Sequence, residues 1–172
     1  MNTPPDFRTL DLTAKSGIGG WLVLPLLGLV LTVLSAGKGF LAETLPSLRR
    51  AAWSQLTSPD SPVYSSFWAP YIVTSGLFNL ILVGSAIILL VLFFRRRRAV
   101  PFLISLFYAF GVVTASFEAL SVRYLSNELP GLMEPEEVRV AYLGIVRSVV
   151  VALVWVSYFR VSTRVRATFV ES

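Results

Sequence analysis

The sequence predicts an all-α membrane protein, a single domain over residues 1–172 that forms a bundle of four transmembrane helices. Each of four apolar runs has about the 20 residues that cross a bilayer core. The chain is 55% hydrophobic with a mean hydropathy of +0.70, far from the balance of soluble domains. Four arginines, Arg95 to Arg98, separate two of the runs, and the chain must leave the membrane there because guanidinium groups are excluded from hydrocarbon.

Composition excludes several classes of function. A chain of 172 residues has no room for a sizeable soluble domain beside four spanning helices. Its formal net charge of +5 comes largely from basic residues beside apolar runs, where they anchor the chain to the lipid bilayer, so we expect no nucleic-acid partner. Cysteine and histidine are absent, which removes disulfides, thiol nucleophiles and imidazole ligands.

The first spanning helix is predicted over residues 17–36, after a polar cytoplasmic tail over residues 1–15. The alternative is a signal peptide, but the run is longer than the apolar core of such peptides and lacks a good cleavage site. We therefore expect the helix to be retained. Pro25 removes one backbone donor and predicts a bend.

A short amphipathic helix is predicted over residues 45–56, between the first two spanning helices. Apolar residues recur there at helical spacing, and the face they form contains Leu48, Ala52, Trp53 and Leu56. Two placements fit this pattern. The helix lies on the outer membrane surface, or it packs on the outer end of the bundle.

The other spanning helices are predicted over residues 71–94, 101–125 and 138–159. A short acidic loop over residues 126–137 joins the last two, and a basic cytoplasmic tail follows over residues 160–172. A proline suits the start of the third helix, because its missing donor would be unpaired there in any case.

The distribution of basic residues predicts that both termini are cytoplasmic. In that orientation the cytoplasmic segments hold nine lysines and arginines and the outer segments five, as the positive-inside rule requires. The residues that anchor this topology are Arg95, Arg96, Arg97, Arg98, Arg160, Arg164 and Arg166.

A cluster of polar residues is predicted inside the bundle. Arg147 lies about 20 Å and Glu118 about 25 Å from the cytoplasmic side at 1.5 Å per residue, so we expect an ion pair between them. Asn79 lies at a similar depth, and Thr114 is one turn from Glu118 on the same face. The alternative is that each charge extends separately to the outer interface.

Two stretches and one turn of the sequence are recognisable. They are Gly17-Ile18-Gly19-Gly20-Trp21-Leu22 with Leu24-Pro25 and Gly28-Leu29, the turn from Phe93-Phe94 to Arg98, and Arg147 with Trp155 to Phe159 and Ser162 to Phe169. Together they resemble a family of small bacterial inner-membrane proteins known as domain of unknown function 2569. The resemblance implies a four-helix protein of the bacterial inner membrane and brings no established activity.

The sequence contains no nucleophile elbow, paired aspartates or phosphate-binding loop, so we expect no catalytic residue, cofactor or metal. We expect a non-enzymatic accessory or assembly component of a membrane complex, or a self-oligomer, with other membrane subunits or itself as partner. One alternative is a small transporter or channel subunit that uses the pair of Glu118 and Arg147. A membrane enzyme is a second alternative.

Overall fold

The computed structural model describes residues 17–171, in which the elements are helical apart from an isolated bridge between Arg97 and Glu171. Within that part of the chain, four helical spans are long and apolar enough to cross a membrane. The prediction of an all-α protein with four such helices is confirmed. The predicted tail over residues 1–15 lies outside the described residues.

The first span is assembled from four segments: η1 (Gly20–Leu22), α2 (Val23–Gly39), the π-helical turn η2 (Phe40–Thr44) and α3 (Leu45–Ser47). The other spans are α5 (Trp68–Phe94), α6 (Val100–Glu128) and α7 (Pro135–Val161), and the short helices are α4 (Arg50–Thr57) and α8 (Thr163–Thr168). Helix α7 begins three residues before the predicted residue 138, because Glu134 and Glu137 form a capping box there.

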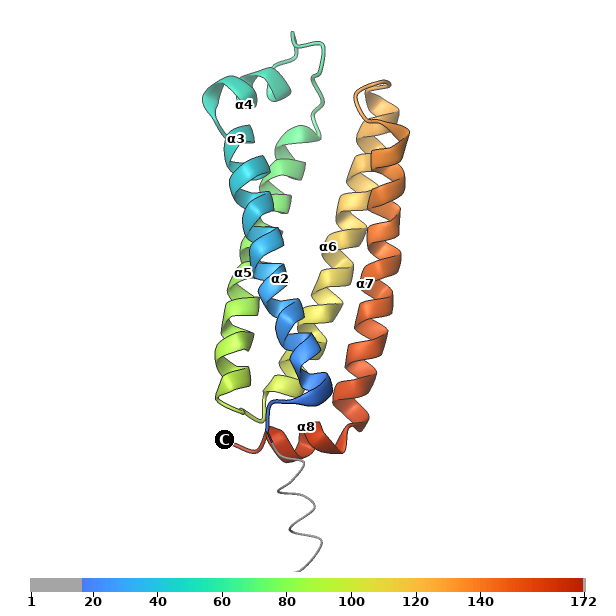
Figure 1. Cartoon of the computed structure of the whole chain (residues 1–172). Coiled ribbons are helices and arrows are strands. Elements are labelled where there is room, and N and C mark those ends of the chain that lie inside the picture. The colour runs from blue at the N-terminus through green and yellow to red at the C-terminus, as the bar shows by residue number, and fades with distance from the viewer. Residues whose placement is uncertain (1–16, 172) are drawn as a thin grey trace, which may run out of the picture.

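The spanning helices are arranged as two pairs. Helix α2 packs along α5 and α6 packs along α7, while contacts between α5 and α6 join the pairs (Figure 1). The pairs lie close together at the end where α8 crosses the bundle, and they diverge toward the end that carries α4 (Figure 1). The two ends of the bundle are therefore built differently.

The first span is longer than the predicted helix over residues 17–36, which is wrong at its C-terminal end. The helix continues through Gly37, Lys38 and Gly39 to Ser47. In hydrocarbon an unpaired backbone group costs several kcal/mol, so glycines that would end a helix in water need not end it here. The side chain of Lys38 is exposed.

Pro46 explains how this span ends. Proline has no N–H to donate to the carbonyl of the preceding turn, and the turn before it is widened, with the Leu45 N–H bonded to the Phe40 oxygen. Arg49 then adopts an extended conformation with φ −66° and ψ 141°. The predicted helix over residues 45–56 is therefore wrong as a single element, because α3 and α4 divide it.

Helix α4 packs at the diverging end of the bundle. Trp53 and Leu56 are partly buried against Trp68, Ile72 and Leu125. Of the other residues predicted on its apolar face, Ala52 is half-buried, whereas Leu48 lies in the turn before α4 and is 45% exposed. The apolar face thus meets the end of the bundle through its C-terminal half.

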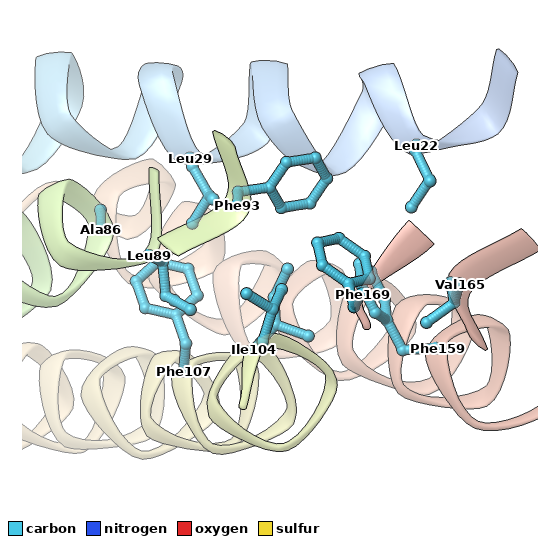
Figure 2. Packing of buried hydrophobic residues seen from close by; sticks show 11 residues of the cluster. Leu22, Leu29, Ala86, Leu89, Phe93, Ile104, Phe107, Phe159, Val165 and Phe169 are labelled. Atoms are coloured by element: carbon cyan, nitrogen blue, oxygen red, sulfur yellow. The ribbon is translucent and has the colours of Figure 1, made fainter. Parts of the chain in front are cut away.

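The opposite end of the bundle is closed by a hydrophobic cluster. Side chains from α2, α5, α6, α7 and the C-terminal segment converge there (Figure 2). Phe169 meets Phe93 edge to face, with 5.0 Å between ring centroids. The buried members of the cluster are Leu22, Leu29, Ala86, Leu89, Phe93, Val100, Ile104, Phe107, Phe159, Val165 and Phe169.

The C-terminal segment, predicted as a cytoplasmic tail over residues 160–172, contains α8 and is bonded to the arginine turn in its described part. The Arg98 N–H donates to the Glu171 oxygen over 2.9 Å, and the Glu171 N–H donates to the Arg96 oxygen over 3.2 Å. The Gly17 N–H donates to the Thr168 hydroxyl over 3.2 Å. We call this network, formed by residues 17, 96–98 and 168–171, the terminal clamp.

The close packing of the first span on α5 depends on Gly76. A Cβ atom at Gly76 would lie 2.7 Å from Cγ2 of Thr44, whereas one at Gly84 of the same helix would meet nothing within 4 Å. We expect Gly76→Ala to destabilise the protein in detergent by about 1–3 kcal/mol through overpacking, and to lower its thermal unfolding midpoint. Gly84→Ala is the matched control and should leave the midpoint unchanged or raise it. Equal shifts in the two variants would contradict this packing.

Candidate functional site

A polar cavity of about 150 Å³ lies between the first span, α5 and α6. It sits toward the diverging end, because its walls come from η2, from the first half of α5 and from the second half of α6. We call it the polar cavity. Its lining residues are Glu43, Thr44, Ser47, Tyr71, Ile72, Ser75, Phe78, Asn79, Leu82, Thr114, Phe117 and Glu118.

Three of the four residues predicted to form the intramembrane cluster line this cavity. Asn79 reaches it from α5, and Thr114 and Glu118 reach it from α6. The Thr114 hydroxyl donates to the Gly111 oxygen over 2.9 Å. In residues 17–171, neither the Asn79 amide nor the Glu118 carboxylate has a hydrogen bond or ion pair.

The predicted ion pair between Glu118 and Arg147 is not formed among the described residues. Arg147 is exposed on α7 and is not a lining residue of the polar cavity. Its neighbours along the helix, Val146 and Val150, are 60% and 53% exposed. Counting residues along the helices placed Glu118 and Arg147 at similar distances from the cytoplasmic side. That distance does not determine the direction in which a helix presents a side chain.

Glu43 and Thr44 line the cavity and were missed by the sequence analysis. Both lie in η2, beyond the predicted end of the first helix at residue 36. The signal was present, because the apolar run resumes after Lys38 with Phe40, Leu41 and Ala42. Glu43 interacts electrostatically with Glu118, so two carboxylates of like charge face one cavity.

Aromatic rings form part of the cavity wall. Phe117 packs edge to face on Phe78 with 5.3 Å between centroids, and its centroid lies 6.2 Å from that of Tyr71. Glu118 and Tyr71 also line a second hollow of about 540 Å³. That hollow continues along α7 through Val140 and Gly144. Glu118 therefore borders open space on two sides.

The charged and hydroxyl groups of the polar cavity do not suit a metal ion. Within residues 17–171, no three acidic side chains gather closely enough to hold a metal ion. Carboxylates of like charge, amides and hydroxyls beside aromatic rings suit recognition of a cationic group.

Four helices long and apolar enough to cross a bilayer define the class: this is a helical, multi-pass membrane protein. Residues 15–170 match the model of a family described as "Protein of unknown function (DUF2569)", and the chain belongs to that family. No curated protein and no solved structure matches the chain. The two sequence stretches that resemble the family meet in the fold, where a Cβ atom at Gly20 would lie 3.0 Å from Nη1 of Arg164.

The separation of Glu118 from Arg147 has a measurable consequence. We expect Glu118→Gln and Arg147→Gln to change the free energy of unfolding additively, within about 0.5 kcal/mol, because residues that share no contact do not couple. Unfolding of the two single variants and the double variant in detergent measures this coupling. A larger coupling, with the double variant less affected than the sum, would show that the two charges meet.

Proposed function

We propose that the protein is a non-enzymatic component of a membrane assembly and that it docks through α7. The observation that carries the proposal is the position of Arg147, the thirteenth of the 27 residues of α7. An arginine at the centre of a spanning helix costs about 2.5–3.5 kcal/mol on insertion scales. A partner helix that pairs with the guanidinium would offset this cost.

The surface around Arg147 supports docking. None of the residues in the most apolar stretch of α7 is buried within the bundle. Gly144 lies one turn away, and a Cβ atom placed there would meet nothing within 4 Å. Small residues allow the backbones of membrane helices to approach closely, so a second helix fits beside Arg147. That helix supplies a carboxylate or an unpaired carbonyl.

The absence of histidine and cysteine, and of a nucleophile elbow or phosphate-binding loop in the sequence, supports a non-enzymatic role. The transporter alternative relied on an ion pair between Glu118 and Arg147, which the described residues do not form. The hydrophobic cluster also fills the bundle on the side of the polar cavity away from α4. These features favour an assembly component over a conducting subunit.

Photo-crosslinking tests the docking surface. A benzoylphenylalanine at Val146, which is 60% exposed, should give one adduct of defined mass in intact membranes. The same probe at Ile88 of α5, which is 59% exposed, is the matched control and should give none.

Arg147→Leu should lower the yield of the Val146 adduct about tenfold or more, because it removes the charge that needs a partner. The mass of the adduct identifies the partner as a second copy or another subunit. Equal adducts at both positions, or an unchanged yield with Arg147→Leu, would exclude docking at Arg147.

The proposal includes an orientation in the bacterial inner membrane with both termini in the cytoplasm. Described residues at both ends of the chain join the arginine turn in the terminal clamp, so the basic anchors share one end of the bundle. Four acidic residues lie in or beside the α6–α7 connection at the other end: Glu128, Glu134, Glu136 and Glu137. By the positive-inside rule, this distribution supports a cytoplasmic terminal clamp.

Single cysteines report this orientation without background, since the chain has none of its own. Asp60 and Ala99 are both exposed and lie in turns at opposite ends of the bundle. A cysteine at Asp60 should react with a membrane-impermeant thiol reagent in intact cells whose outer membrane has been permeabilised. A cysteine at Ala99 should react only after the inner membrane is opened. The reverse pattern would invert the topology.

A further inference from the structure

We propose that the polar cavity binds the protonated primary amine of a small organic cation. The cavity lies within the membrane-spanning part of the bundle, and among the described residues no lysine or arginine lines it. Glu43 and Glu118 both face it without an ion pair in residues 17–171. Both carboxylates are exposed toward open space, and because they carry like charges, a cation held between them would relieve their mutual repulsion. This inference is independent of docking through α7.

Thr44 gives a second, separate indication of a ligand. The residue is 7% exposed and its methyl group lies against Gly76. Its hydroxyl makes no hydrogen bond within the described residues. The described residues contain no fully buried polar side-chain atom without a hydrogen-bond partner, so the Thr44 oxygen is not fully buried. Because Thr44 lines the polar cavity, its oxygen opens into that cavity. The Asn79 side chain likewise has no partner in residues 17–171. Both offer an oxygen acceptor to the three donors of an ammonium group.

The walls select an organic cation over a metal ion. Calcium takes six or more oxygen ligands. In residues 17–171, no three acidic side chains lie close enough together to hold a metal ion. Phe117 and Tyr71 instead present aromatic surface, which attracts ammonium groups. A cavity of about 150 Å³ is large enough for a small organic molecule, which is room for an ammonium group and a few carbons.

A primary ammonium could reach the cavity from two sources, a free amine or the headgroup of an aminophospholipid. Ethanolamine is the probe, because it represents both, and ethylene glycol is its neutral counterpart of the same size. Calorimetric titration of the full chain in nanodiscs of phosphatidylcholine and phosphatidylglycerol, which lack primary amines, measures binding. Ethanolamine should bind, and ethylene glycol at the same concentration and salt should not.

A second set of nanodiscs that contain phosphatidylethanolamine distinguishes the sources. Binding of free ethanolamine that persists there identifies a free amine as the ligand. Suppressed binding, together with a higher unfolding midpoint of the protein, identifies the lipid headgroup. Both results support an ammonium site.

Conservative variants locate the site. Glu43→Gln and Glu118→Gln should each weaken ethanolamine binding about tenfold or more, since each replaces a charge-assisted hydrogen bond by a neutral one. Asp60→Asn removes an exposed carboxylate from a turn outside the cavity and should bind like the unchanged protein. Circular dichroism checks that each variant is folded.

Three results would overturn the proposal. The first is equal binding of ethanolamine and ethylene glycol, which needs no variant and so holds even if a glutamine variant does not fold. The second is unchanged affinity in both glutamine variants. The third is binding that is absent from the unchanged protein and present in Arg147→Gln, which would show that the guanidinium of the chain itself fills the cavity.

Discussion

At the arginine-rich end of the bundle, two backbone segments far apart in the sequence satisfy each other's hydrogen bonds. The arginines of the Arg95–Arg98 turn cannot enter hydrocarbon, so the chain reverses there, and a reversal leaves backbone groups unpaired. The C-terminal segment pairs with these groups through Glu171, while the Arg98 side chain donates to the Val170 oxygen over 2.6 Å. With that segment bonded in place, Val165 and Phe169 complete the hydrophobic cluster between the two helix pairs.

This arrangement concentrates the packing at one end and leaves the other end open to polar groups. The described buried residues at the diverging end form a smaller cluster around Trp68 and Leu125. Ser65 and Glu128 are joined there by a hydrogen bond between their side chains. A thin bundle of four helices has few positions that face inward, so a polar cavity and a continuous apolar core cannot occupy the same level. The structure separates them along its length.

The features that follow from hydrophobicity could be predicted from the sequence. Because charged residues are excluded from hydrocarbon, they mark the ends of the apolar runs. Helix α5 accordingly ends at the predicted residue 94, directly before Arg95. The end of the first span could not be predicted this way, because Gly37, Lys38 and Gly39 are poor helix signals in water, whereas the membrane penalises a broken helix more strongly. That error removed Glu43 and Thr44 from the candidate site.

The orientation of side chains around each helix was the other limit. Asn79, Thr114 and Glu118 could be grouped by depth, and all three line the polar cavity. Arg147 satisfies the same depth criterion but is exposed on α7. Rotation of a helix about its axis depends on which face packs best, and α7 packs against α6 with little else around it. One sequence does not contain that information for a helix that is apolar on all sides.

The terminal clamp also imposes an order on biosynthesis. A ribosome makes the chain from the N-terminus, so all four spanning helices are synthesised before Phe169 and Glu171. Until those residues emerge, Phe93 lacks its aromatic neighbour and the backbone of the arginine turn lacks its partner. The two helix pairs can therefore insert as separate hairpins and adjust their contact while synthesis continues. Closure of the arginine-rich end therefore follows the synthesis of all four spanning helices, because residues 168–171 come after them in the sequence.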